Sequence, residues 1–90
     1  MNIEVNNQKY ELLTNYKDAF NEEEFVHLFT DYFYDFDYII GDYAYSKLRL
    51  KGFYEDNNKK SKKINKISTK DEYIKVNCAY NCKYFVLKKI

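Results

Sequence analysis

The spacing of apolar residues changes several times along this 90-residue chain, and these changes constrain its fold more than any other feature. Alternating apolar and polar residues are typical of strands with one buried face, whereas apolar residues three or four positions apart are typical of helices. The successive patterns predict the order β-β-α-β-β-α-β. We therefore expect an α+β fold, with a small, mostly antiparallel sheet of about five strands and two helices. This length predicts a single domain over residues 1–90.

Local sequence signals predict the first hairpin and the first helix. Asn6-Asn7 predicts the turn of a β-hairpin, because asparagine tolerates the left-handed backbone that two-residue turns require. A helix is predicted over residues 22–34, with Asn21 accepting hydrogen bonds from the free N–H groups of its first turn. Glu22-Glu23-Glu24 places negative charge at the positive end of the helix dipole. The residues expected on its buried face are Phe25, Leu28, Phe29, Tyr32 and Phe36.

A second hairpin is predicted around Gly41-Asp42, where glycine would supply the positive φ of a two-residue turn. Pairing Ile40 with Tyr43 then divides the side chains between two faces. One face carries Ile39, Ala44, Ser46, Leu48 and Leu50, and the other carries Tyr38, Ile40, Tyr43, Tyr45, Lys47, Arg49, Lys51 and Phe53. Because leucines favour the core, we expect this second, aromatic-basic face to look outward at least in part.

The remaining chain predicts a loop, a helix and a strand. Residues 55–66 are polar and rich in lysine, as expected for a loop. A second helix is predicted over residues 69–79, and Asn81 suits a left-handed helix stop. Residues 84–87 are apolar on both faces, which predicts a central strand.

Several segments match a known pattern in order and at compatible spacing. They are Asn21-Glu22-Glu23, Phe36-Asp37-Tyr38-Ile39-Ile40-Gly41-Asp42-Tyr43, Leu48-Arg49-Leu50-Lys51-Gly52-Phe53, Ile67-Ser68-Thr69 leading to Cys78, and Cys82-Lys83-Tyr84-Phe85-Val86-Leu87-Lys88-Lys89. Together they resemble the YutD-like family of small bacterial proteins over nearly the whole chain. The family often has glycine or tryptophan where this chain has Tyr43, Ala44 and Ser46, and glycine where it has Asn81. The resemblance implies a compact α+β fold and transfers no catalytic residue.

Composition and motifs favour a binding module over an enzyme. No apolar run approaches the length of about 18–20 residues that a membrane span needs, and the start lacks the pattern of a signal peptide. We therefore expect a cytoplasmic protein without a membrane partner. Cys78 and Cys82 are too few for a zinc site, and His27 lies in another element. An enzyme would rest only on these three residues and Asp42, so we expect no catalytic residue, metal or cofactor.

The charge is unevenly distributed along the chain. Residues 1–44 hold ten acidic and two basic residues, whereas residues 45–90 hold four acidic and thirteen basic ones. The two halves could neutralise each other within the fold or display opposed faces. The sequence leaves both alternatives open.

Two binding hypotheses follow from the placement of these residues. Cations beside flat rings suit single-stranded nucleic acid such as RNA, with the lysine-rich loop adding phosphate contacts. The candidate residues are Tyr43, Tyr45, Lys47, Arg49, Lys51, Lys59, Lys60, Lys62 and Lys63. The alternative is a protein-interaction module that uses the acidic first helix or exposed tyrosines. A solvated strand, with basic side chains that cover apolar surface or pair with the acidic half, would explain the same pattern without any ligand.

Overall fold

The computed structural model describes residues 1–77 and 83–90. Within these residues, five strands form one antiparallel sheet in the order β1-β2-β5-β3-β4. The strands are β1 (Asn2–Val5), β2 (Gln8–Tyr16), β3 (Tyr38–Ala44), β4 (Lys47–Phe53) and β5 (Tyr84–Lys89). The helices are α1 (Glu22–Leu28), η1 (Asp31–Asp35), η2 (Ile67–Thr69) and α2 (Lys70–Asn77), of which η1 and η2 are 3-10 helices. The predicted α+β fold is confirmed.

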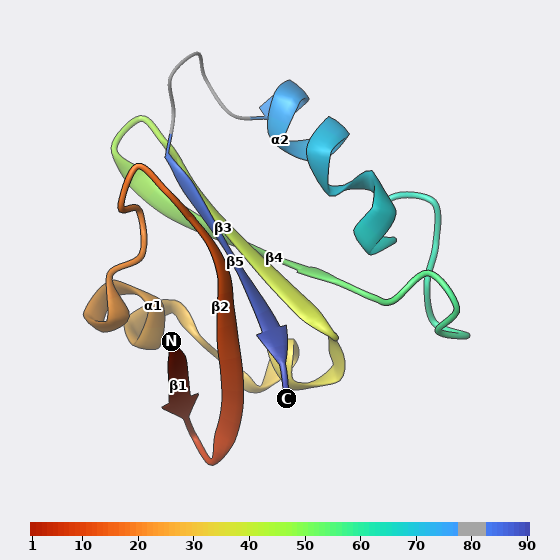
Figure 1. The fold of residues 1–90 in the computed structure, drawn as a ribbon, viewed down its shortest axis with the longest axis horizontal. Helices are drawn as coiled ribbons and strands as arrows, with labels where there is room; N and C mark the ends of the chain where they lie inside the picture. The colour runs from red at the N-terminus through yellow and green to blue at the C-terminus, as the bar shows by residue number, and fades with distance from the viewer. Residues whose placement is uncertain (78–82) are drawn as a thin grey trace.

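The sheet is covered on both faces, with α1 and η1 on one side and α2 on the other (Figure 1). The larger core lies on the α1 side, where Phe25, Phe29 and Phe33 pack against Ile39 and Phe85. A smaller core lies beneath α2 and consists of Tyr38, Ile40, Phe53 and Val86, with Ile67, Tyr73, Ile74 and Tyr84 packed against it. Both faces of the central strands are therefore buried.

The first hairpin and the last strand follow their predictions. Asn6 and Asn7 form the turn with φ angles of 49° and 69°, and Glu4 pairs with Lys9. The left-handed conformation is one that asparagine adopts more readily than most residues. Strand β5 lies between β2 and β3, so its prediction as a central strand is confirmed.

The first helix begins where it was predicted but ends earlier. Asn21 Oδ1 accepts a hydrogen bond from the Glu24 N–H at 3.0 Å, which confirms the cap. The predicted end at residue 34 is wrong, because α1 stops at Leu28 and Phe29 has an extended backbone with ψ of 134°. The interruption turns Phe29 and Phe33 into the core, whereas Leu28 and Tyr32 are exposed. Burial of these two rings outweighs the continuation of one regular helix.

The predicted second turn is also wrong. Gly41 and Asp42 lie in the middle of β3, and the turn consists of Tyr45 and Ser46, whose φ angles are 53° and 65°. The glycine serves another purpose, because a Cβ atom on it would lie 2.1 Å from Cζ of Phe85. The ring of Phe85 on β5 therefore needs a residue without a side chain at this position, and the glycine is part of the strand.

The new register changes the two predicted faces only in part. Leu48 and Leu50 share the α1 side of the sheet, as predicted, but Tyr43 joins them there because it pairs with Leu48. Ala44 pairs with Lys47 on the opposite side. The predicted second helix is present as α2, and its predicted end, together with Cys78, Asn81 and Cys82, lies outside the described residues.

Candidate interaction surface

The predicted aromatic-basic face of β4 is covered at one end and exposed at the other. The Lys51 ammonium lies 4.7 Å from the centroid of the Tyr73 ring on α2, and it donates a hydrogen bond to the Ile64 carbonyl at 3.0 Å. Phe53, at the end of the same strand, is fully buried beneath α2. The face therefore looks outward in part, because Lys47 and Arg49 are exposed whereas α2 packs against Lys51 and Phe53.

Arg49 is held by a carboxylate of its own chain. Its guanidinium donates to Asp42 Oδ2 at 2.7 Å, and the Asp42 side chain is only 1% exposed. The hydrogen bond to Asp42 raises the pKa of Arg49. Asp42 was predicted to lie in a turn, and it is instead the buried partner of a cation on the neighbouring strand. The pair neutralises one of the three cations assigned to the aromatic-basic face.

The two candidate tyrosines lie in different surroundings. Tyr43 is on the α1 side of the sheet, where its hydroxyl donates to Glu24 Oε1 at 3.2 Å. Burial, and then the charge of Glu24, raise the pKa of Tyr43. Tyr45 lies in the β3–β4 turn and is 99% exposed. The structure therefore separates Tyr43 from the basic side chains of β4.

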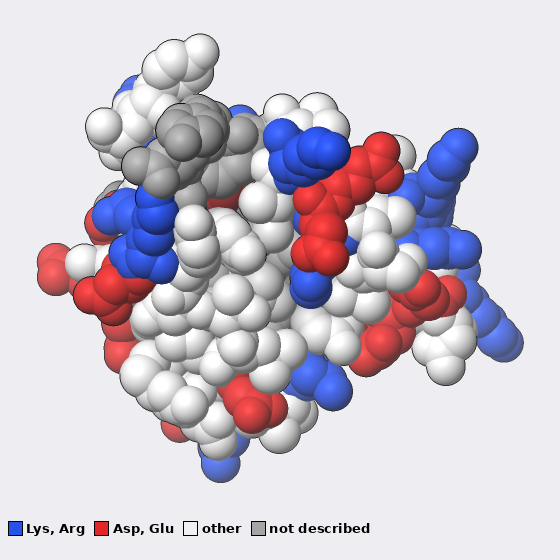
Figure 2. Space-filling model, turned by 45° about the horizontal axis from the view of Figure 1, so that its top comes forward, with Lys and Arg blue, Asp and Glu red and all other residues white. Residues whose placement is uncertain are grey.

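The lysines of the loop are on the surface, away from the β3–β4 turn. Lys60 forms an ion pair with Asp35, and Lys59, Lys62 and Lys63 are exposed. Figure 2 shows basic side chains projecting at the right-hand edge, where this loop lies in Figure 1. The structure does not bring the nine residues of the nucleic-acid hypothesis together in one surface.

Of the residues considered for catalysis, Cys78 and Cys82 lie outside the described residues, and the other two lie in different surroundings. His27 is exposed on α1, whereas Asp42 is buried in the sheet. Residues 1–77 and 83–90 contain no group of three or more histidine, cysteine or acidic side chains that could hold a metal ion. In the same part of the chain, no helix has the length and apolar character needed to cross a membrane.

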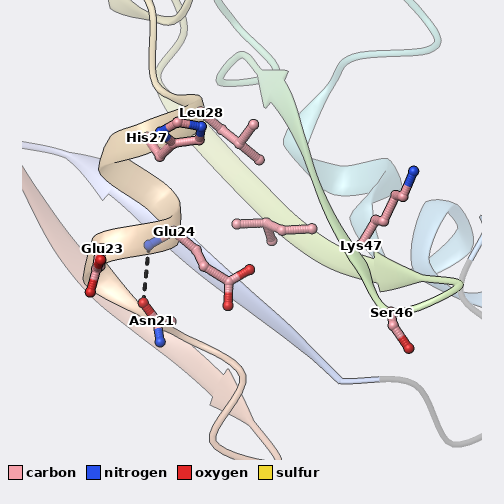
Figure 3. Close-up of a pocket in the computed structure, with 8 residues that line it drawn as sticks. Asn21, Glu23, Glu24, His27, Leu28, Ser46 and Lys47 are labelled. Atoms are coloured by element: carbon pink, nitrogen blue, oxygen red, sulfur yellow. Dashed lines mark hydrogen bonds between the residues drawn. The ribbon is translucent and has the colours of Figure 1, made fainter.

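What the structure does bring together is a cleft between α1 and the β3–β4 turn, with a volume of about 640 Å³. It is lined by Asn21, Glu23, Glu24, His27, Leu28, Ser46, Lys47 and Leu48. The Glu24 carboxylate and the Leu28 side chain project into the space between helix and strand, whereas Lys47 points to the other side of β4 (Figure 3). The cleft therefore combines an apolar wall with an acidic rim.

The cleft has a tyrosine beside it that contributes nothing to packing. Ser46 lines the cleft, and its neighbour Tyr45 extends into solvent from the same turn. Both residues have positive φ angles, although a non-glycine residue in this conformation costs on the order of 1–3 kcal/mol. The left-handed conformation is the one that a two-residue hairpin turn requires, and here the turn presents an exposed aromatic ring.

Sequence reasoning missed this cleft for identifiable reasons. Leu28 was assigned to the core and Glu24 only to the helix cap, because α1 was expected to continue along one regular stripe. The early end of α1 leaves Leu28 at the surface, 39% exposed. The available signal was the triplet Glu22-Glu23-Glu24, of which Glu23 and Glu24 line the cleft.

Comparisons with known proteins agree with one another. The family described as "Putative antitoxin YutD-like" matches residues 4–88 of the chain. A relative named "Putative antitoxin YutD", from Bacillus subtilis (strain 168), is 50% identical over 88 residues, which cover 98% of this chain and 97% of the relative. A solution NMR structure of the protein yutD from B. subtilis has a TM-score of 0.84 and 49% identity. It covers 100% of this chain and 82% of that chain.

Proposed function

The chain belongs to the YutD-like family, and on this premise we propose that it is a non-catalytic protein-binding module. Its binding surface consists of the cleft between α1 and the β3–β4 turn, with Tyr45 as the exposed anchor beside it. We refer to this cleft and Tyr45 together as the cleft surface. The observation that carries the proposal is the fully exposed Tyr45 ring on a strained backbone, next to a cleft with leucine in its wall.

The chemistry of the cleft surface supports a protein as the ligand. Tyrosine is enriched among the residues that contribute most to protein interfaces. Leu28 and Leu48 offer apolar surface, and Glu23 and Glu24 lie at the rim of the same cleft. Acidic groups repel a phosphate backbone but attract basic protein segments. The name "antitoxin" of the relative also fits a protein partner, because a protein antitoxin can act by binding its toxin.

Photo-crosslinking in cells of the source organism tests this proposal. The residue p-benzoylphenylalanine is introduced in place of Tyr45 or, as a matched control, in place of the exposed Tyr32 on η1. After irradiation in the cytoplasm of intact cells, we expect the protein with the probe at position 45 to form one defined adduct that resists nuclease. Glu24→Gln should weaken this adduct. The proposal fails if position 45 yields no protein adduct, or one no stronger than position 32.

Nucleic acid is the second candidate ligand, and it rests on the lysine loop. Lys59, Lys62 and Lys63 are exposed at one edge of the molecule, where they could contact phosphates. The same crosslinking experiment separates the two functions. An adduct that disappears on nuclease treatment, and that is lost in a variant with these three lysines replaced by glutamine, would favour single-stranded nucleic acid instead.

A further inference from the structure

Strand β4 is an outer strand of the sheet, so one of its edges lacks a neighbouring strand. The two-residue turn makes Ala44 and Lys47 the first pair of the hairpin, and such a pair is joined by hydrogen bonds. Alternation along an antiparallel ladder then directs the N–H and C=O groups of Arg49 toward β3. By the same alternation, the backbone groups of Leu48 and Leu50 point away from the sheet.

No described residue pairs with this part of the edge. The chain returns beside the sheet at the far end of β4. There the Lys51 side chain donates to the Ile64 carbonyl, and Tyr54 donates to the Asn65 carbonyl at 2.8 Å and accepts from the Ile67 N–H at 2.8 Å. No loop or turn hydrogen bond among residues 1–77 and 83–90 reaches the backbone of Leu48 or Leu50. Exposed edges of this kind are templates for pairing with another chain.

The cleft lies directly beside this edge, on the side of the sheet that carries Leu48. A residue paired with Leu48 from an added strand would place its side chain on the same side of the sheet. That side chain would enter the space between Leu48, Leu28 and Glu24. The leucines can cover the aliphatic stem of a lysine or arginine, while the Glu24 carboxylate accepts hydrogen bonds from its cationic end.

We propose that the partner contributes an extended segment that pairs with the edge of β4 and places a lysine or arginine in the cleft. This inference rests on the proposed protein-binding function and specifies how the partner is held. Strand addition supplies main-chain hydrogen bonds, and the cleft supplies selectivity for the basic side chain. Lys47 and Arg49 project on the opposite face of β4, and the Asp42 carboxylate already pairs with Arg49, so the basic residue is selected on the cleft side.

A phage-displayed library of random dodecapeptides, selected on the whole immobilised protein, is the probe for this inference. We expect the recovered peptides to have residues of high strand propensity around a lysine or arginine. Glu24→Gln should lower their affinity by about fivefold or more, because it removes the charge at the cleft. The matched control is Glu22→Gln, since this residue of the same turn does not line the cleft, and its effect should be small.

The edge itself is tested at Leu50. Leu50→Pro removes an outward N–H without removing a hydrogen bond to β3, and proline is tolerated on edge strands in this orientation. We expect about tenfold weaker peptide binding than in Leu50→Thr, which keeps the N–H while also removing the leucine. In the unsubstituted protein, bound peptide should slow hydrogen exchange of the Leu48 and Leu50 amides by at least about tenfold. The hydrogen-exchange measurement uses the unsubstituted protein, so it remains informative even if the proline variant fails to fold.

Each outcome decides the inference. Recovery of no specific peptide, equal binding by the two Leu50 variants, or unchanged exchange at both amides would overturn strand addition. The protein-binding function would survive any of these results if the probe at position 45 still crosslinks a protein in cells. Loss of that adduct would instead remove the function from which the inference begins.

Discussion

The left-handed backbone of Tyr45 and Ser46 costs free energy, and packing of the Tyr45 ring does not offset this cost. Both adopt left-handed φ angles, and the Tyr45 side chain has 99% of its surface in solvent. A turn of this geometry favours Asn-Gly, because these residues adopt positive φ angles at little cost. The other hairpin of the protein uses Asn6-Asn7 for the same geometry. The tyrosine is therefore explained better by recognition than by folding.

Replacing the turn by Tyr45→Asn and Ser46→Gly should stabilise the protein. We expect the free energy of unfolding in urea to rise by about 1–2 kcal/mol, since the strain of two positive φ angles is relieved. The same variant should lose the partner that the cleft surface binds. Asn7→Gly is the matched control, and it should change stability by only a few tenths of a kcal/mol. No gain from the double substitution would contradict the argument that the turn is strained.

Helix α1 is a short element that depends on its ends. Seven residues are too few for an independently stable helix, so the cap at Asn21 and burial of Phe25 must hold it. Its position matters for the cleft surface, because Glu24 and Leu28 extend from it toward β4. The Tyr43 hydroxyl adds a contact from β3 to the Glu24 carboxylate. One short helix therefore contributes a capped first turn, a core residue and part of the cleft.

Removal of the cap should affect stability and binding together. We expect Asn21→Ala to lower the free energy of unfolding by about 0.5–2 kcal/mol, because the Glu24 N–H loses its acceptor. Urea unfolding followed by circular dichroism measures this change. Asn21→Asp keeps a capping oxygen and should remain within a few tenths of a kcal/mol of the original. Equal effects of the two substitutions would show that the side-chain hydrogen bond does not hold the helix.

At the scale of the whole molecule, the charge asymmetry of the sequence is only partly neutralised internally. Among the described residues, ion pairs of Arg49 with Asp42 and of Lys60 with Asp35 connect the acidic first half with the basic second half. The lysine loop remains at one end of the molecule, and α1 lies toward the other (Figures 1 and 2). Such a separation favours partners that approach the α1 end with basic groups.

Buried phenols should make the whole protein sensitive to alkaline pH. Burial raises the pKa of Tyr10 to about 12, and its fully buried hydroxyl has no hydrogen-bond partner among the described residues. Burial and the hydrogen bond to Glu55 raise the pKa of Tyr38 to about 12. The hydrogen bond to Asp35 is the main cause that raises the pKa of Tyr54 to about 12. Each phenol is held in its neutral form by the fold.

The sign of the effect follows from these raised values. Their contribution to stability is complete below the unfolded pKa of about 10 and is lost as pH rises toward 12. We therefore expect the free energy of unfolding to fall over this range, as measured by urea titrations at successive pH values. Tyr10→Phe should reduce this fall and leave stability at pH 7 equal or higher, because an unpaired buried hydroxyl is removed. An identical alkaline slope in the variant would contradict the assignment.

The sequence by itself determined the features that depend on neighbouring residues. Asn6-Asn7 specified its turn, Asn21 its cap, and the changing periodicity the order of strands and helices. Family membership could also be recognised, because it rests on segments read in order along the chain. Local backbone preferences and hydrophobic spacing are sufficient for predictions of this kind.

The tertiary structure alone decided where the second turn lies, where α1 ends and which surface is open. Gly41 belongs to a strand because Phe85 packs on it, and the Lys51 end of the basic face of β4 is covered because Tyr73 of α2 lies against Lys51. Each of these contacts joins residues far apart in sequence. Local preferences contain no information about which distant side chain will arrive, so the cleft surface could emerge only from the packed fold.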